Sequence, residues 1–126
     1  MGNVLFCAFV VFFIITAVLS SGLANAESER HKNNYVKYEA ADELYYDDEK
    51  YDKALILYKE LIPLYPKAYI LEYKAAMCEY FLANYSAARD HGIRALELWP
   101  FLVRDEDFMI FFKDALKLSG DEAGSA

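Results

Sequence analysis

At 126 residues the chain has room for one small domain, and its formal net charge of -7, all of it after residue 26, argues against binding to nucleic acid. Of its two cysteines, Cys7 lies in an N-terminal apolar run and Cys78 in the body, which excludes a disulfide framework within one chain. No phosphate-binding loop, paired-histidine metal motif or nucleophile elbow occurs, so the sequence predicts a protein that is not an enzyme and uses no cofactor or metal.

The N-terminal segment is nearly all apolar from residue 4 to residue 19 and is followed by small residues and Ala24-Asn25-Ala26. This order predicts a signal peptide over residues 1–26, with Glu27 as the new N-terminus. No basic residue precedes the apolar run, which leaves an uncleaved membrane anchor over residues 4–24 as the alternative. We therefore expect an exported protein (secreted, periplasmic or in the lumen of the secretory pathway) or a membrane-anchored one.

The next residues, 27–34, are polar and balanced in charge, and are expected to form a flexible linker. From Tyr35 the apolar residues follow helical spacing until a turn at residues 47–50. A second helix follows, with its apolar side between Ala54 and Ile62, and Pro66 is expected to stop it.

The pattern then recurs. A helix is expected over residues 69–82, a turn over 83–86, and another helix over 87–98 that closes at Pro100. A fifth helix is expected within residues 103–118, from about Arg104. Residues 119–126 are expected to be a disordered tail.

Two stretches of the chain, residues 51–66 and 85–100, have nearly the same pattern. A shift of 34 positions places Tyr51 on Tyr85, Ala54 on Ala88 and Pro66 on Pro100. A fixed period of this length predicts an all-α fold of stacked antiparallel helix hairpins.

The units 35–68 and 69–102 together resemble two tetratricopeptide repeats (TPRs), and the fifth helix resembles the capping helix of that family, giving a TPR-like α-solenoid of five helices. The resemblance rests on small residues at the expected helix crossing, an aromatic early in each second helix and a proline at its end. The sequence departs from the family pattern at five positions: Asp42, Leu61, Glu72, Glu79 and Gly92.

The resemblance implies that a peptide or helix of a partner protein binds in a groove lined by the first helix of each repeat. Its position-matched residues are Glu39, Glu43, Tyr46, Ile70, Tyr73, Lys74, Met77, Tyr80 and Phe81. The same residues would equally serve as packing against the fifth helix. In the family, clamp residues that hold a terminal carboxylate are Lys and Asn, and here Glu39 and Glu43 stand at those positions, so an acidic peptide terminus is not expected as the ligand.

The fifth helix carries five apolar residues in succession, from Phe108 to Phe112. A helix that buries a single face cannot bury all five of them. The alternative function is therefore a self-associating or membrane-tethered assembly factor, with a homodimer as its self-associated form, that uses Phe108, Phe111 and Phe112 as its surface. The one feature that points toward an enzyme is the unpaired Cys78, with His91 as a conceivable base. A small buried hydrophobe is the expected role of that cysteine.

Overall fold

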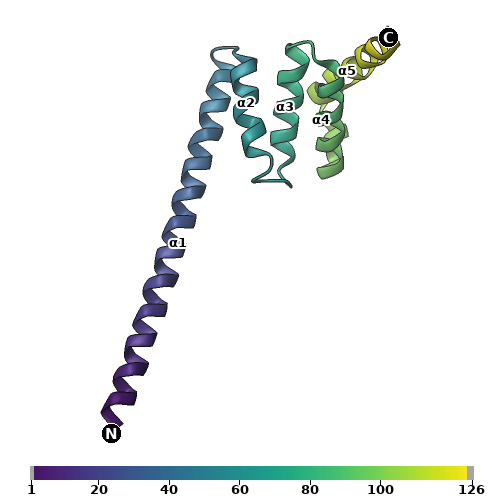
Figure 1. The fold of residues 1–126 in the computed structure, drawn as a ribbon. Helices are drawn as coiled ribbons and strands as arrows, with labels where there is room; N and C mark the ends of the chain where they lie inside the picture. The colour runs from purple at the N-terminus through teal and green to yellow at the C-terminus, as the bar shows by residue number, and fades with distance from the viewer. Residues whose placement is uncertain (1, 125–126) are drawn as a thin grey trace. The chain divides into compact units, whose positions relative to one another are not determined.

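A computed structural model describes residues 2–124, with side chains from 10 to 120, and in this range the chain is all-helical with no strand (Figure 1). The elements are α1 (Gly2–Tyr46), α2 (Tyr51–Leu61), α3 (Tyr69–Phe81), α4 (Tyr85–Leu98), the 3-10 helix η1 (Pro100–Arg104) and α5 (Glu106–Gly124). The chain divides into two compact units between Val36 and Lys37.

The N-terminal unit is helical throughout, so the prediction of a flexible linker over residues 27–34 was wrong. No proline or glycine occurs between Leu23 and Tyr46, and glutamate, lysine and arginine in this segment are good helix formers. Glu27 and His31 also approach each other to 3.9 Å one turn apart. Large apolar side chains from Val10 to Leu23 are exposed within the structure, and α1 is long and apolar enough to cross a membrane, a property that it shares with signal sequences.

The first core cluster of the second unit lies where the last turns of α1 meet α2 and α3. Ala41, Ala54 and Ala75 are fully buried there, and their small side chains let the helices approach closely. Tyr58 and Leu61 fill the remaining space. The helix pattern expected from the sequence therefore matches the packing of this part.

A second core cluster joins α3, α4, η1 and α5. It contains Phe108, Phe111 and Phe112, which are 0%, 4% and 6% exposed, so their prediction as an oligomer surface was wrong. The three rings bury themselves against their own chain: Phe108 and Phe112 stack at 5.3 Å, and Phe108 meets Phe111 edge-on at 5.1 Å. Only Ile110 of this apolar run is fully exposed, at 70%, while Met109 is half-buried.

The glycine on α4 creates the room for this arrangement. A Cβ added at Gly92 would lie 2.6 Å from a ring carbon of Phe112, closer than real contacts allow. The ring of Phe112 from α5 occupies the space beside Gly92.

Replacing Gly92 with alanine is expected to destabilise the protein. Overpacking costs about 1–3 kcal/mol and exceeds the gain of about 1 kcal/mol from better helix propensity, leaving a net loss of about 1 kcal/mol in urea denaturation. The double variant Gly92→Ala/Phe112→Leu should lose less than the sum of the two single changes. Additive losses would show that the two residues do not compete for the same space.

The turns differ in small ways from the sequence predictions. The turn at residues 47–50 is confirmed, whereas α4 begins at Tyr85, two residues before the predicted start. The second helix ends at Leu61, ahead of both prolines that follow it.

The last helix begins later and ends later than predicted. Residues 100–104 form η1, and Asp105 then caps α5 by accepting the amide hydrogen of Phe108 at 2.9 Å. The helix continues to Gly124, so the predicted disordered tail was wrong for residues 119–124, and the rest of it lies outside the described residues. Ser119 lies within the helix, where it is buried and its hydroxyl donates to the Leu116 carbonyl at 3.0 Å.

Candidate functional site

The second unit contains an open hollow of about 460 Å³ between the last turn of α1, α3 and the first turns of α5. We call it the aromatic hollow. Its lining comprises Tyr45 and Tyr46 from α1, Tyr73, Met77, Tyr80 and Phe81 from α3, and Asp107, Ile110 and Phe111 from α5. Five of the nine predicted groove residues are therefore brought together here.

The inner side of the hollow is made of rings that also pack against α5. Tyr73 lies 5.3 Å from Phe108 and 5.9 Å from Phe111 between ring centroids, and Tyr80 lies 5.8 Å from Phe111. The hydroxyl of Tyr80 donates a hydrogen bond to Asp114 on α5. These two tyrosines thus line the hollow and hold α3 to α5 at the same time.

The rim of the hollow is more accessible. Tyr46 is 63% exposed, Phe81 is 47% exposed and Ile110 is 70% exposed. Phe81 stacks on Tyr51 with a distance of 4.5 Å between ring centroids, and Tyr46 contacts Tyr45 edge-on with a centroid distance of 4.6 Å. Tyr46 and Ile110 can therefore contact a ligand, and neither belongs to a core cluster.

The other four predicted groove residues do not line the hollow. Glu39 and Glu43 are exposed on α1, and helical spacing places them on the same face as Tyr46. Ile70 is half-buried against the first core cluster. Lys74 is buried and engaged in a polar network.

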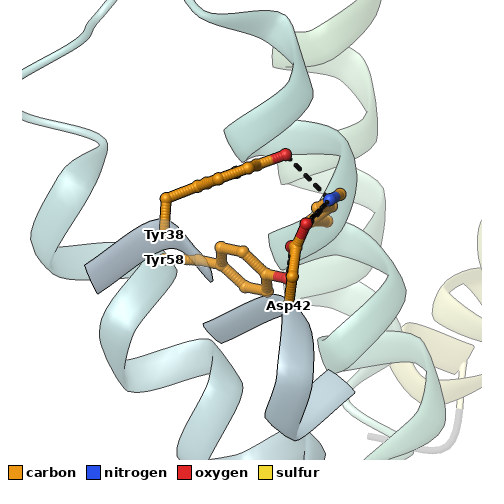
Figure 2. A network of polar contacts seen from close by, with 4 residues as sticks. Tyr38, Asp42 and Tyr58 are labelled. Carbon is orange, nitrogen blue, oxygen red and sulfur yellow. Dashed lines mark hydrogen bonds and ion pairs between the residues drawn. The ribbon is translucent and has the colours of Figure 1, made fainter. Parts of the chain in front are cut away.

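This polar network links three helices (Figure 2). The Lys74 ammonium on α3 donates to both carboxylate oxygens of Asp42 on α1 at 2.7 Å, and to the Tyr38 hydroxyl at 2.8 Å. The Tyr58 hydroxyl on α2 donates to Asp42 at 2.5 Å. The carboxylate that departs from the family pattern is thus the acceptor of a cross-helix network.

The electrostatics of this network follow from burial and pairing. Burial by itself would lower the pKa of Lys74, but its bonds to Asp42 and Tyr38 outweigh this and raise the pKa above the usual 10.5. Burial, aided by the bond to Asp42, raises the pKa of Tyr58. At neutral pH Lys74 is therefore an ammonium ion.

Two further acidic residues, Glu72 and Glu79, also have polar partners. Glu72 is buried and lies 2.6 Å from His91 Nδ1 on α4. Glu79 is buried, pairs with Lys59 at 2.9 Å and accepts from the Asn84 amide at 2.8 Å. Among the described residues, no buried polar side-chain atom lacks a hydrogen-bond partner.

Cys78 is placed as a core residue. It is fully buried, and burial together with the Glu79 charge raises the pKa of its thiol from 9.0 to about 12. The thiol is therefore protonated at neutral pH and a poor nucleophile. Within the described residues, no cluster of three potential metal-ligating side chains occurs.

Alkaline pH is expected to destabilise the protein from about pH 9 upward. The pKa is raised to about 12 for Cys78 from 9.0 and for Tyr73 from 10.0, in both cases mainly by burial. The folded state keeps protons that the unfolded chain releases, so their stabilisation is complete below the unfolded pKa and is lost as the pH rises toward the folded pKa. For Cys78 the loss is about 1 kcal/mol per pH unit.

Urea denaturation from about pH 8 to pH 11 measures this loss, with Cys78→Ala as the comparison. The variant starts from a lower stability because of the cavity, yet its stability should stay flat until the tyrosines titrate near pH 10. An equally steep decline from pH 9 in this variant would contradict the assignment to Cys78.

Sequence reasoning did not place Tyr45, Asp107, Ile110 and Phe111 in the groove. The missed signal was the first turn of the fifth helix, where an acidic cluster is followed directly by apolar residues. That turn closes one side of the hollow.

None of the comparisons with protein-family models, curated proteins and solved structures gives a match.

Proposed function

We propose that the chain is a non-enzymatic, exported protein–protein interaction module whose TPR-like repeats bind a peptide or helix of a partner protein. The repeat hypothesis is supported by backbone geometry that recurs after 34 residues. Glu49 and Ala83 both have positive φ, of 50° and 63°. The residues that follow them, Lys50 and Asn84, both have φ -90° and ψ 70° and precede α2 and α4.

Peptide binding is supported above all by the aromatic hollow itself. Ligand sites in proteins are concave and mainly apolar, with a few polar groups that orient the ligand. Here apolar and aromatic side chains from three helices line the hollow together with one acidic residue, Asp107. Aromatic residues are also the commonest energetic anchors of protein interfaces.

The double variant Tyr46→Ser/Ile110→Ser is expected to weaken peptide binding at least about tenfold, because it removes two exposed apolar contacts at the rim. The measurement is isothermal titration calorimetry with a peptide selected on the full-length parent from a synthetic library. Circular dichroism should show unchanged helicity, since both residues are exposed.

The matched control for that test is Ile56→Ser on α2, where an isoleucine is 59% exposed and lies away from the hollow. This control should bind as the parent does. Undiminished binding by the double variant would show that the hollow is not the peptide site.

Export is proposed from the apolar run and the Ala24-Asn25-Ala26 pattern. Cleavage after Ala26 predicts a mature protein that begins at Glu27, which intact-mass spectrometry of the protein recovered from its producing cells would detect. A chain that retains residues 1–26 and partitions with membranes would instead support the anchor over residues 4–24.

The alternative function is a self-associating or membrane-tethered assembly factor. The buried phenylalanines of α5 no longer favour it, but three apolar side chains around η1 do: Trp99, Phe101 and Val103 are 40%, 58% and 55% exposed. In this case Phe101→Ser should convert a dimer into a monomer in light scattering. A parent protein that is monomeric at all concentrations would rule the homodimer out.

A further inference from the structure

The aromatic hollow has the composition of a site for a positively charged group. Its rings come from Tyr45, Tyr46, Tyr73, Tyr80, Phe81 and Phe111, and its one charged lining residue is Asp107. The face of an aromatic ring attracts a cation within about 6 Å of its centroid. An occupant with a neutral apolar side chain would gain nothing from the carboxylate of Asp107.

The surroundings of the hollow are acidic as well. Asp105 and Asp107 act on the hydroxyl of Tyr73 strongly enough to contribute to its raised pKa, after burial. On α1, Glu39 and Glu43 extend along the face that presents Tyr46. No lysine or arginine lines the hollow.

One ring of the hollow, that of Tyr46, already lies beside an ammonium group. Lys74 Nζ lies 5.3 Å from the centroid of Tyr46 and 4.7 Å from that of Tyr38. Both oxygens of Asp42 lie 2.7 Å from the same nitrogen, so the charge of Lys74 is compensated and does not repel a second cation. The chain therefore offers charge complementarity to a cationic ligand and not to an acidic one.

We propose that the occupant of the aromatic hollow is a lysine or arginine side chain of a basic peptide segment. Its charged end lies against the tyrosine rings and Asp107, while Glu43 and Glu39 face further basic residues of the same segment. This inference rests on the proposed function and specifies the chemistry of the partner. A second copy of this chain is disfavoured as the occupant because each copy carries a net charge of -7.

The test uses the full-length chain in a non-ionic detergent and a blocked alanine–lysine repeat peptide, compared with the same peptide acetylated on every lysine. Acetylation removes the charge and the cation–π donor while keeping the four-carbon stem of the side chain. We expect the lysine peptide to bind at least about tenfold more tightly in calorimetry, and its binding to weaken with added salt. Binding should also shift the NMR signals of the Tyr46 and Tyr73 rings.

Two variants separate a site in the hollow from general attraction to an acidic protein. Tyr46→Leu keeps apolar area but removes a ring, and Asp107→Asn removes the charge, so each should weaken the lysine peptide about fivefold to tenfold. Asp90→Asn removes an exposed carboxylate on α4, outside the hollow, and should leave binding unchanged.

Each outcome decides one question. Equal or tighter binding of the acetylated peptide in the hollow would overturn the cationic occupant and leave peptide binding intact. Equal weakening by Asp90→Asn and Asp107→Asn, with none by Tyr46→Leu, would overturn the inference in favour of diffuse charge attraction. Failure of both these peptides and any library-selected peptide to bind would overturn the proposed function as well.

Discussion

Replacing Asp42 with alanine is expected to lower the free energy of unfolding by about 3 kcal/mol. The change leaves the buried Lys74 ammonium without the carboxylate whose two oxygens lie 2.7 Å away, and it also deprives the Tyr58 hydroxyl of its acceptor. Removing one partner of a buried ion pair costs about 3–5 kcal/mol, and we take the lower end because the side chain of Asp42 is 27% exposed. Urea denaturation followed by circular dichroism measures the loss.

A double-mutant cycle separates the interaction from the burial cost of each charge. Lys74→Met removes the charge but fills the same space, so the double variant Asp42→Ala/Lys74→Met should lose clearly less stability than the sum of the two single variants. The control is Lys37→Met, which breaks the exposed pair with Glu60 at 3.0 Å and should cost less than about 1 kcal/mol. Equal losses at Asp42 and Lys37 would contradict a buried network.

The positions where the sequence departs from the repeat pattern show why the fold was easier to predict than the contacts. Periodicity located the helices, because each apolar face buries alanines such as Ala54 and Ala88 at regular spacing. By the same pattern, Asp42, Glu72 and Glu79 were departures from the residue types expected at their positions. Their partners lie far away in the sequence, so no local pattern could have paired Asp42 with Lys74 or Glu72 with His91.

The ends of the helices and the burial of the apolar run on α5 were also difficult to predict from local sequence. Charged residues 27–34 resemble a linker in composition, yet nothing in them breaks a helix. The burial of Phe112 on α5 depends on a glycine of α4, since Gly92 leaves space for its ring. The residues of the aromatic hollow on α3 were among the predicted groove residues and share a face by helical spacing, whereas Asp107 and Ile110 on α5 were not predicted.

Truncation of Phe108 is expected to cost more than any other single apolar change in the second core cluster. Phe108 has no exposed surface, and its ring contacts Tyr73, Phe111 and Phe112 at centroid distances of 5.3, 5.1 and 5.3 Å. Phe108→Ala should therefore lower the free energy of unfolding by about 4 kcal/mol, the sum of lost burial and a residual cavity. Phe108→Leu, which retains more of the volume, should cost about 1.5 kcal/mol or less.

The control is the same truncation at an exposed phenylalanine. Phe101 is 58% exposed on η1, and Phe101→Ala should change the stability by no more than about 0.5 kcal/mol. Sedimentation at several protein concentrations makes the comparison decisive, because an intramolecular core predicts that Phe108→Ala lowers stability equally at all concentrations. A loss that appears only in concentrated samples, together with a change in oligomeric state, would return Phe108 to an interface between copies.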